Sequence, residues 1–557
     1  MSPSTKSPFC NVIIIGAGFS GLAMACQLKR KLNYDDYIIY DRCAEPGGTW
    51  WANRYPGCGV DIPAAFYSLS FAPNPDFSKF FPKQAEILQY FNDVARKFDV
   101  SRHVVCNTEW QGAYWQDHSK TWMVKLRNLS TGEPFVQECK VLISAVGGLV
   151  NPNPFHISGI DTFEGEIIHT ARWKSDISLY QKDVVVIGNG SSAAQLVPAI
   201  VDQVKSLTQF IRTPQYYLPS ENREMHVLWR LIFRYVPGVL LILRILVFLI
   251  LESTGGKFAL TRDAAAARRE STERSKNYIM KFAPERYWPL LMPSYELGCK
   301  RRVFDNDNYI SCLQRDHVHL TDDPIVALQP RSVLTKSGKQ YPADVILLAT
   351  GFSLTQYDVD LRGRNGYTRE NHWKSIGCKE AYKSVAMGGF PNFFYVLGPN
   401  SGRGHTSTIY SIENHVDLII QVIKPVLKGR ASSVEVQTSS ERLYNMQLHA
   451  AIDRTVFTNT CRTYFIDKET GKNWFIYPWD SFTMWYQTHW DGMGDWTYEY
   501  DEGKDTHWQH WLSSVSNFFM FAIGLIIFAF NGSVNMAIKP KGSSASTDIK
   551  ARSTVSG

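Results

Sequence analysis

Two segments of the chain have the glycine pattern that binds the pyrophosphate of a dinucleotide, and each follows a short apolar run. The first segment reads Gly16-Ala17-Gly18-Phe19-Ser20-Gly21, and the second reads Gly188-Asn189-Gly190-Ser191-Ser192-Ala193. In this pattern the first glycine permits a tight turn, the second lets the backbone approach the phosphates, and the third position allows a helix to pack closely on a strand. Two such segments in one polypeptide predict that a nicotinamide nucleotide passes hydride to a bound flavin.

The residues around these segments predict an α/β fold with two Rossmann-like dinucleotide-binding domains. A chain of 557 residues is too long for a single hydrophobic core. The apolar run 345–348 is expected to return the chain to the first domain, so that the second domain is inserted into the first. The expected boundaries are 1–150 for the first part of the first domain, 151–180 for a linker, 181–340 for the second domain with a helical insert at about 222–295, and 341–505 for the rest of the first domain.

The residues that follow the second strand of each unit indicate which dinucleotide binds there. Asp41 follows the apolar run 37–40, and a carboxylate at this place accepts hydrogen bonds from ribose hydroxyls. The second unit has Arg212 and Thr213 instead, which suit the 2′-phosphate of NADPH. We therefore expect FAD at the first site and NADPH at the second; a solvated surface charge is the alternative interpretation of Arg212.

The charge and cysteine patterns argue against two other kinds of partner. The formal net charge of +7 is spread along the whole chain without a basic block, so no nucleic-acid binding is predicted. Ten cysteines occur without a Cys-x-x-Cys pair or a His/Cys cluster of metal-ligand spacing, so no metal site is predicted.

Two apolar stretches point to a membrane. The unbroken run 518–530, followed by a short polar tail, predicts a single-pass C-terminal anchor at 511–531 with the catalytic domains in the cytosol and a disordered tail at 532–557. A helix packed on the body or in the bilayer interface is the alternative. The stretch 236–251 has Arg244 near its middle, which is costly at a bilayer centre, so we expect a buried or interfacial helix there.

Two further motifs resemble the signatures of the Baeyer–Villiger monooxygenases, a group of flavoprotein monooxygenases. One is Phe163-x-Gly165-x-x-x-His169-Thr170-x-x-Trp173; the other is Gly47-Gly48-Thr49-Trp50, continuing through Tyr55-Pro56-Gly57 to Asp61. The resemblance covers most of 9–465 and is similar to the fungal branch that tailors secondary metabolites. The family pattern has Pro or Asp where this chain has Lys174. The resemblance therefore does not say how this segment couples the two domains.

The resemblance implies roles for particular residues. Arg301 would be the active-site arginine and Asp61 its carboxylate partner. Lys300 would reach the 2′-phosphate together with Thr213, although a basic surface turn is the plainer interpretation of 300–302. Thr49, Trp50 and Tyr67 would contact FAD, with a plain core role an equal alternative for Trp50 and Tyr67. Phe163, Gly165, His169 and Trp173 would be motif or hinge residues.

The resemblance also implies a reaction. An FAD-, NADPH- and O₂-dependent enzyme would convert a ketone to an ester or lactone through a C4a-peroxyflavin. The aromatic content of 13% and the two apolar stretches point to a hydrophobic substrate, such as a secondary-metabolite intermediate. One alternative is a flavin monooxygenase that oxygenates nitrogen or sulfur; a second is a membrane-tethered nucleotide-binding protein without catalysis. Trp173 and the pair of Asp61 with Arg301 favour the first interpretation.

Overall fold

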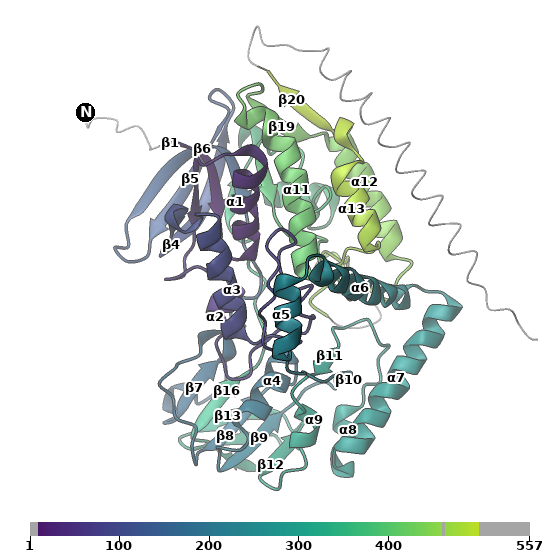
Figure 1. Cartoon of the computed structure of the whole chain (residues 1–557). Coiled ribbons are helices and arrows are strands. Elements are labelled where there is room, and N and C mark those ends of the chain that lie inside the picture. The colour runs from purple at the N-terminus through teal and green to yellow at the C-terminus, as the bar shows by residue number, and fades with distance from the viewer. Residues whose placement is uncertain (1–8, 459–462, 501–557) are drawn as a thin grey trace, which may run out of the picture. The chain divides into compact units, whose positions relative to one another are not determined.

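The computed structural model describes residues 9–458 and 463–500. These residues are organised around two principal β-sheets, and each sheet contributes one strand–turn–helix unit with a glycine-rich turn (Figure 1). The predicted α/β class with two Rossmann-like units is confirmed. The predicted helix at 511–531 and the tail at 532–557 lie outside the described residues.

Eight strands form the first sheet: β1 (Phe9–Ile15), β2 (Tyr37–Tyr40), β3 (Val104–Val105), β4 (Thr108–Gln116), β5 (Thr121–Asn128), β6 (Pro134–Ser144), β17 (Asp360–Arg362) and β18 (Phe393–Tyr395). The order is β17-β4-β5-β6-β1-β2-β3, and β18 also pairs with β6. Strand β1 pairs in parallel with β2 and β6, whereas β4, β5 and β6 form an antiparallel meander. Val12, Ile13 and Ile14 of β1 are completely buried because the sheet is covered on both faces.

Five strands form the second sheet in the order β12-β9-β8-β16-β7: β7 (Glu166–His169), β8 (Asp183–Ile187), β9 (Ser206–Phe210), β12 (Val318–Thr321) and β16 (Val345–Leu348). All of its pairings are parallel. In sequence, the whole sheet lies between β6 and β17 of the first sheet.

One strand prediction was wrong. The run 345–348 was expected to return the chain to the first domain, but β16 pairs with β7 and β8 in the second sheet. A fully apolar parallel strand suits the centre of either sheet, so its composition could not identify its partners. The predicted domain boundaries stay predictions.

Helices cover the sheets and connect them. Helix α1 packs against α3 and α11, α11 packs against α13, and α4 packs against α9. The helices outside the insert are α1 (Phe19–Leu32), α2 (Thr49–Ala52), α3 (Gln84–Lys97), α4 (Ser191–Ile200), α9 (Tyr309–Cys312), α10 (Arg369–Ile376), α11 (Thr408–Leu427), α12 (Thr438–Ile452) and α13 (Ser481–His489). Smaller sheets are formed by β10 (Tyr217–Pro219) with β11 (Val303–Asp305), by β13 (Ile325–Gln329), β14 (Ser332–Thr335) and β15 (Gln340–Pro342), and by β19 (Ser433–Val436) with β20 (Trp496–Glu499).

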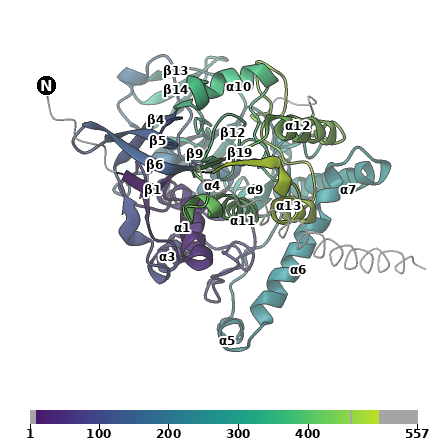
Figure 2. The ribbon, with the colours of Figure 1, turned by 90° about the horizontal axis from the view of Figure 1, so that it is seen from above.

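The helical insert follows β10 and contains α5 (Val227–Tyr235), α6 (Val239–Ser253), α7 (Arg262–Phe282) and α8 (Trp288–Leu291). Viewed from above, α5 and α6 extend beyond the neighbouring helices (Figure 2). Within the described residues, one helical stretch, Val239–Phe258, is long and apolar enough to cross a membrane, with a mean hydropathy of 2.1. Only 11% of it is buried, so the expectation of a buried helix was wrong, whereas an interfacial helix remains a prediction.

The two sheets share one continuous hydrophobic core. It contains Val12 and Ile14 from β1 together with Val184 and Val186 from β8. The loop between α2 and α3 contributes Tyr55 to the same core. The two dinucleotide-binding units are therefore packed against each other rather than joined only by a linker.

Candidate active site

The first glycine segment forms a turn into which only glycines fit at two positions. Gly16 has φ +110°, and a Cβ there would lie 2.6 Å from the carbonyl oxygen of Ala145. A Cβ at Gly21 would lie 2.0 Å from the carbonyl oxygen of Gly16, so the helix lies tightly against the turn. Helix α1 begins after Gly18 without a side-chain cap, which leaves its first N–H groups available to phosphate oxygens.

A second backbone segment closes over the same turn. Gly48 has φ +55°, and a Cβ at this position would lie 2.8 Å from the Cα of Gly18. Two chain segments without side chains therefore meet beside the start of α1. This is the kind of cradle that a pyrophosphate requires, because any side chain would fill it.

The residues after Gly48 were predicted to contact FAD. Thr49 begins α2, and Trp50 is buried, with its Nε1 donating a hydrogen bond to Tyr67 Oη over 3.1 Å. The two rings also meet edge to face at 5.6 Å. Trp50 and Tyr67 are thus held together in the core, and their contact with FAD stays a prediction.

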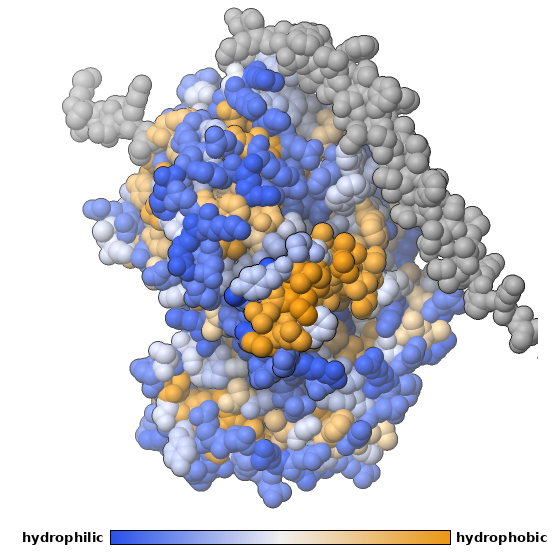
Figure 3. All heavy atoms as spheres, in the orientation of Figure 1, coloured by the Kyte–Doolittle hydropathy of each residue, from blue (hydrophilic) through white to orange (hydrophobic). Residues whose placement is uncertain are grey.

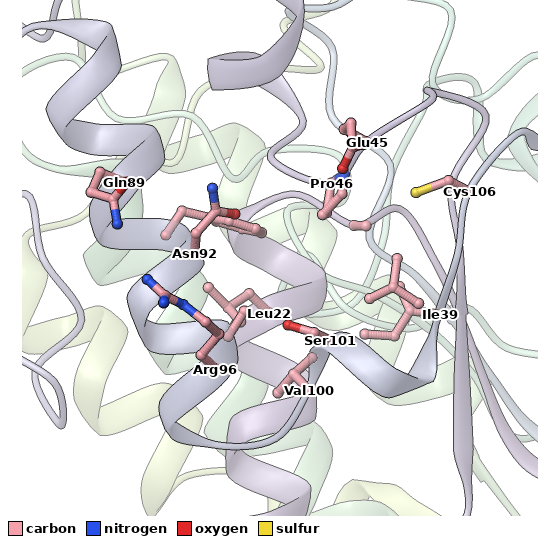
Figure 4. A pocket seen from close by; sticks show the side chains of 14 residues that line it. Leu22, Ile39, Glu45, Pro46, Gln89, Asn92, Arg96, Val100, Ser101 and Cys106 are labelled. Atoms are coloured by element: carbon pink, nitrogen blue, oxygen red, sulfur yellow. The ribbon is translucent and has the colours of Figure 1, made fainter.

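A cavity of about 520 Å³ lies beside the first glycine segment (Figure 4). Its wall combines apolar side chains from α1, β2 and the end of α3 with polar groups of Glu45, Gln89 and Asn92. An apolar slot with hydroxyl-binding groups suits the adenosine part of FAD. Glu45 was missed by the sequence reasoning, and its place two residues before Gly47 was the signal that could have found it.

Asp41 has a structural role in addition to its predicted role of binding ribose hydroxyls. Its carboxylate accepts hydrogen bonds from the backbone N–H of Ala17 over 2.7 Å and of Cys43 over 2.8 Å. The carboxylate thereby fixes the glycine turn next to the end of β2. Carboxylate oxygens can each accept further hydrogen bonds, so a ribose hydroxyl is compatible with this geometry.

The second glycine segment repeats the turn but leaves more space. Gly188 has φ +117°, and a Cβ there would lie 2.3 Å from the carbonyl oxygen of Ala349. A Cβ at Gly190 would meet nothing within 4 Å, so the space in front of α4 is open. Ser191 and Ser192 form the first turn of α4, and Ala193 is completely buried behind them.

Two cations meet near this second turn. Partial burial and the charge of Arg212 lower the pKa of Lys300, which places the two groups within electrostatic reach of each other. The Lys300 ammonium lies 4.6 Å from the centre of the Tyr295 ring. Among the described residues, neither cation has a carboxylate within 4.0 Å, so this pair is suited to bind an anion such as a 2′-phosphate. Thr213 follows Arg212, and its carbonyl accepts a hydrogen bond from Asn189 Nδ2 over 2.8 Å, which joins it to the glycine turn.

Arg301 and Asp61 form an ion pair between the two dinucleotide sites. The distance from Arg301 Nη2 to Asp61 Oδ2 is 3.0 Å, and 52% of the Arg301 side-chain surface remains accessible. Burial alone would raise the pKa of Asp61, but the charges of Arg301 and Arg302 hold it below its ordinary value. In turn, Asp61 raises the pKa of Arg301. The guanidinium is therefore permanently charged.

Contacts between the two units hold Asp61 opposite Arg301. Tyr55 Oη donates a hydrogen bond to Gln195 Oε1 on α4 over 2.7 Å, and Gln195 Nε2 donates to the carbonyl of Gly59 over 3.0 Å. Gly57 has φ +80°, and a Cβ there would lie 2.1 Å from the carbonyl oxygen of Gln195. The second family motif is thus a loop of the first unit that lies directly on the nicotinamide unit.

The first family motif is an edge strand and turn of the second sheet. His169 ends β7; its Nε2 lies 3.0 Å from the carbonyl oxygen of Gly351, and its Nδ1 accepts a hydrogen bond from the N–H of Ala171. The imidazole is therefore neutral with its proton on Nε2, and burial lowers its pKa. A Cβ at Gly165 would lie 2.3 Å from the Asp344 carbonyl oxygen.

The rest of this motif packs locally. Phe163 packs on the small core of the second sheet, and Trp173 packs against the core that both units share. Lys174, which departs from the family pattern, forms an exposed ion pair with Glu166 over 2.7 Å. The structure thus brings Arg301 together with Asp61 and leaves Lys300 within reach of the charge of Arg212, while His169 lies in the inter-unit connection.

The prediction that the chain has no metal site stays a prediction. Ligand atoms of Cys378, Glu380 and His449 lie within 4.8 Å of one another, but His449 Nε2 and Glu380 Oε1 already form a 2.5 Å hydrogen bond.

Comparisons with known proteins support the class that the fold and the site define, a monooxygenase with two dinucleotide sites. Residues 14–83 match the family model of an NAD(P)-binding Rossmann-like domain. A Baeyer–Villiger monooxygenase of Pseudomonas aeruginosa is 31% identical over 84% of this chain and 88% of that protein, and one of Streptomyces coelicolor is 32% identical over the same shares. The FAD-binding monooxygenase ktnD of Aspergillus niger is 31% identical over 86% of this chain and 79% of that protein.

Solved structures agree with this. Cyclohexanone monooxygenase from Rhodococcus sp. Phi1 bound to NADP⁺ is 26% identical with a TM-score of 0.78, covering 89% of this chain and 100% of that chain. The chain belongs to the Baeyer–Villiger monooxygenases. It is an FAD- and NADPH-dependent flavin monooxygenase with Baeyer–Villiger activity.

Proposed function

We propose that Arg301 and Asp61 are the catalytic pair of this enzyme and that its substrate is a hydrophobic ketone. The overall reaction consumes ketone, O₂, NADPH and a proton, and yields ester or lactone, NADP⁺ and water. One oxygen atom enters the product and the other leaves as water, so NADPH supplies the two electrons required. FAD, when bound, supplies the redox centre at which these electrons activate oxygen.

The observation that carries this proposal is the half-exposed Arg301 guanidinium held by Asp61 at the junction of the two units. Negative charge develops on the substrate carbonyl oxygen as it is attacked. A fixed guanidinium stabilises such a charge without giving up a proton. Asp61 fixes the direction of the guanidinium, because the ion pair leaves Arg301 few other orientations.

The fit of the remaining residues supports the cofactor sites. The FAD site would use the turn at 16–21 together with Asp41, Thr49, Trp50 and Tyr67. The NADPH site would use the turn at 188–193 together with Arg212, Thr213 and Lys300. Phe163, Gly165, His169 and Trp173 would couple the two units, because β7 and its following turn join the linker to the nicotinamide sheet.

Aromatic rings near the arginines support a hydrophobic substrate. The ring centres of Phe258 and Phe457 lie 4.7 Å apart with the rings tilted by 37°. A Cβ at Gly298 or at Gly404 would contact the Phe258 ring within 3.2 Å. Arg302 donates a hydrogen bond to the carbonyl of Gly404 in the same place. A bulky apolar ketone, such as a secondary-metabolite intermediate, suits this apolar neighbourhood of the arginines better than a small polar one.

The test is NADPH-dependent oxygenation by the purified FAD-loaded protein. A series of 2-alkanones of increasing length should give esters with kcat/KM rising by up to about fourfold for each buried methylene, as about 0.8 kcal/mol of transfer free energy allows. Equal turnover of short and long ketones would contradict the substrate proposal. Oxygenation of amines or sulfides alone would favour the N- or S-oxygenating alternative, and no NADPH oxidation at all would favour a non-catalytic nucleotide-binding protein.

We also propose that the segment 511–531 anchors the protein in a membrane with the catalytic domains in the cytosol. Support comes from the unbroken apolar run 518–530 and the lysines after it. Carbonate extraction of cell membranes tests this, since an anchored protein stays in the pellet and a peripheral one is released.

A further inference from the structure

The outer surface of α6 is apolar and uncovered. Its exposed side chains, each 47–64% accessible, are Leu241, Ile242, Ile245, Leu246, Leu249 and Ile250. Together with the apolar side chains of α5 they form a continuous hydrophobic area, which we call the α5–α6 face (Figure 3). A contiguous apolar area of this kind on a folded protein marks an interaction site.

The opposite side of α6 is fixed to the protein. Arg244 and Val247 are buried, and Leu243, Phe248 and Leu251 pack against the shared core. Exposed and packed positions thus alternate with helical periodicity, although every one except Arg244 is apolar. A helix that is apolar on all sides is normally covered on all sides, whereas α6 is covered on one only.

Arg244 prevents α6 from spanning a bilayer in this fold. Its Nη1 donates hydrogen bonds to the carbonyl oxygens of Ser68 over 2.7 Å and Ala65 over 3.1 Å, and its Nη2 lies 3.4 Å from Glu413 Oε2. Glu413 also accepts hydrogen bonds from the N–H and hydroxyl of Ser70. Insertion across a membrane would break this buried network, so α6 can meet a bilayer only sideways.

Helix α5 has the composition of a helix that lies in a membrane interface. None of its residues is buried, Trp229 is 52% accessible, and Arg230 and Arg234 lie one turn apart. The stretch 227–251 contains no acidic residue and no lysine, so its charges are all arginines. Aromatic and aliphatic side chains beside cationic ones are typical of helices that bind the boundary between lipid headgroups and acyl chains.

We propose that the α5–α6 face docks this enzyme sideways onto a phospholipid bilayer. Between 241 and 250 the exposed side chains of α6 are all Leu or Ile, and none of them can form a hydrogen bond. Such a surface suits acyl chains better than a protein partner, whose interfaces carry regular hydrogen bonds. Arg234 of α5 forms an ion pair with Asp76 over 2.5 Å, so Arg230 is the α5 cation without a carboxylate partner among the described residues and the one suited to anionic headgroups. The membrane anchor proposed for 511–531 would keep the protein at the lipid surface onto which this face docks.

The end of α6 lies next to the site of Arg301 and Arg302. Glu252 accepts a hydrogen bond from the N–H of Ser481 over 2.9 Å, and its Oε2 lies 3.2 Å from His405 Nε2. The same loop holds Gly404, whose carbonyl Arg302 contacts. Docking through the α5–α6 face therefore places this loop close to the lipid surface. The docking proposal itself does not depend on the substrate.

Hydrogen exchange of the full-length FAD-loaded protein tests the proposal. Backbone exchange is compared with and without vesicles of phosphatidylcholine and phosphatidylglycerol. Peptides from 227–253 should exchange at least tenfold more slowly when vesicles are present. Since this readout is separate for each peptide, a contribution from 518–530 to vesicle binding does not obscure it.

The variant introduces two glutamates on the α5–α6 face. The control introduces two glutamates at exposed apolar residues elsewhere. Ile242→Glu with Leu246→Glu should abolish the vesicle-induced protection of 227–253, with unchanged FAD content and Tm. Leu443→Glu with Met446→Glu on α12, where the native side chains are 57% and 71% accessible, should leave that protection unchanged.

Three outcomes would overturn the proposal. Full exchange of 227–253 in vesicle-bound protein would show that the face does not touch lipid. Equal protection with and without vesicles would show that 518–530 or another part of the chain covers the face. Protection that rises with protein concentration alone would show that a second copy does so. If the variant with Ile242→Glu and Leu246→Glu fails to fold, the exchange of the wild-type protein with and without vesicles still tests the proposal.

Discussion

Arg301 Nη2 and Asp61 Oδ2 lie 3.0 Å apart, although the two residues are 240 positions apart in the sequence. Asp61 belongs to a loop of the FAD unit, and Arg301 follows the helical insert of the NADPH unit. Relative movement of the two units therefore changes the position of the guanidinium directly. The ion pair couples the geometry of nucleotide binding to the electrostatics of the reacting centre.

Replacing Asp61 by Asn tests this coupling. The amide keeps the shape of the side chain but removes the charge that orients Arg301, so ester formation should fall by about 10- to 100-fold, the range of a misplaced charged group at a reacting centre. NADPH oxidation should continue with release of H₂O₂. Parallel assays of NADPH, product and peroxide measure this; an equal loss of all three would instead indicate failure to bind a nucleotide.

The same pair predicts the acid response of stability. Because the pKa of Asp61 is held below its ordinary value, the carboxylate stabilises the folded state at all pH values above that ordinary value of about 3.9. The contribution is lost only as the pH falls further, through the lowered pKa. The difference in unfolding free energy between wild type and Asp61→Asn should thus be constant from pH 7 to about pH 5 and shrink below pH 4. If the difference in unfolding free energy already disappeared near pH 6, the pKa of Asp61 would not be lowered in the folded protein.

Removal of the Lys300 side chain should weaken the use of NADPH but not of NADH. A charge-assisted hydrogen bond contributes about 1.5–3 kcal/mol, so Lys300→Ala should raise the KM for NADPH by about 10- to 100-fold and leave the KM for NADH nearly unchanged. Arg212→Ala should act in the same direction. If both side chains hold one phosphate, the double variant should lose less NADPH-binding free energy than the two single variants lose in sum. An equal rise in the KM for NADPH and for NADH would show that Lys300 does not bind the 2′-phosphate.

Two glycine-to-alanine changes should have different effects. At Gly21 a Cβ would lie 2.0 Å from a backbone oxygen, so the substitution should destabilise the protein by about 1–3 kcal/mol or more and reduce FAD content. At Gly190 φ is −79° and the space is open, so Gly190→Ala should fold normally and impair only NADPH binding. Thermal unfolding and flavin absorbance separate the two results.

Breaking the buried pair of Arg244 and Glu413 should be costly. Arg244→Met leaves a buried carboxylate without its partner, which typically destabilises by about 3–5 kcal/mol. Adding Glu413→Gln should restore much of that loss. Chemical denaturation of the single and double variants measures both effects, and an unchanged midpoint in Arg244→Met would show that α6 is not held by this residue.

The local structure around each glycine segment was predictable from the sequence. The runs 37–40 and 183–187 coincide with β2 and β8, because apolar residues between turn-forming segments leave little alternative to a buried strand. The glycines at 16, 21 and 188 occupy turns where a Cβ would collide with the backbone, as the pattern implies.

Long-range partners were less predictable. The strand 345–348 carries no side chain that distinguishes one sheet from the other, so its place between β7 and β8 depends on the whole topology. For α6 the sequence left a buried and an interfacial helix open, because its apolar residues continue around the whole helix. The partnership of Arg301 with Asp61 came from resemblance to a family, because no local pattern connects two residues so far apart.

The interleaving of the two sheets sets an order in which a growing chain can fold. All strands of the second sheet come from 166–348, so this sheet can close before the rest of the chain exists. The first sheet still lacks β17 and β18 at that stage, and β18 pairs beside the central strands only after residue 395 has been made. During synthesis the nicotinamide unit is thus able to mature first, and the flavin unit must remain open until the chain returns to complete it.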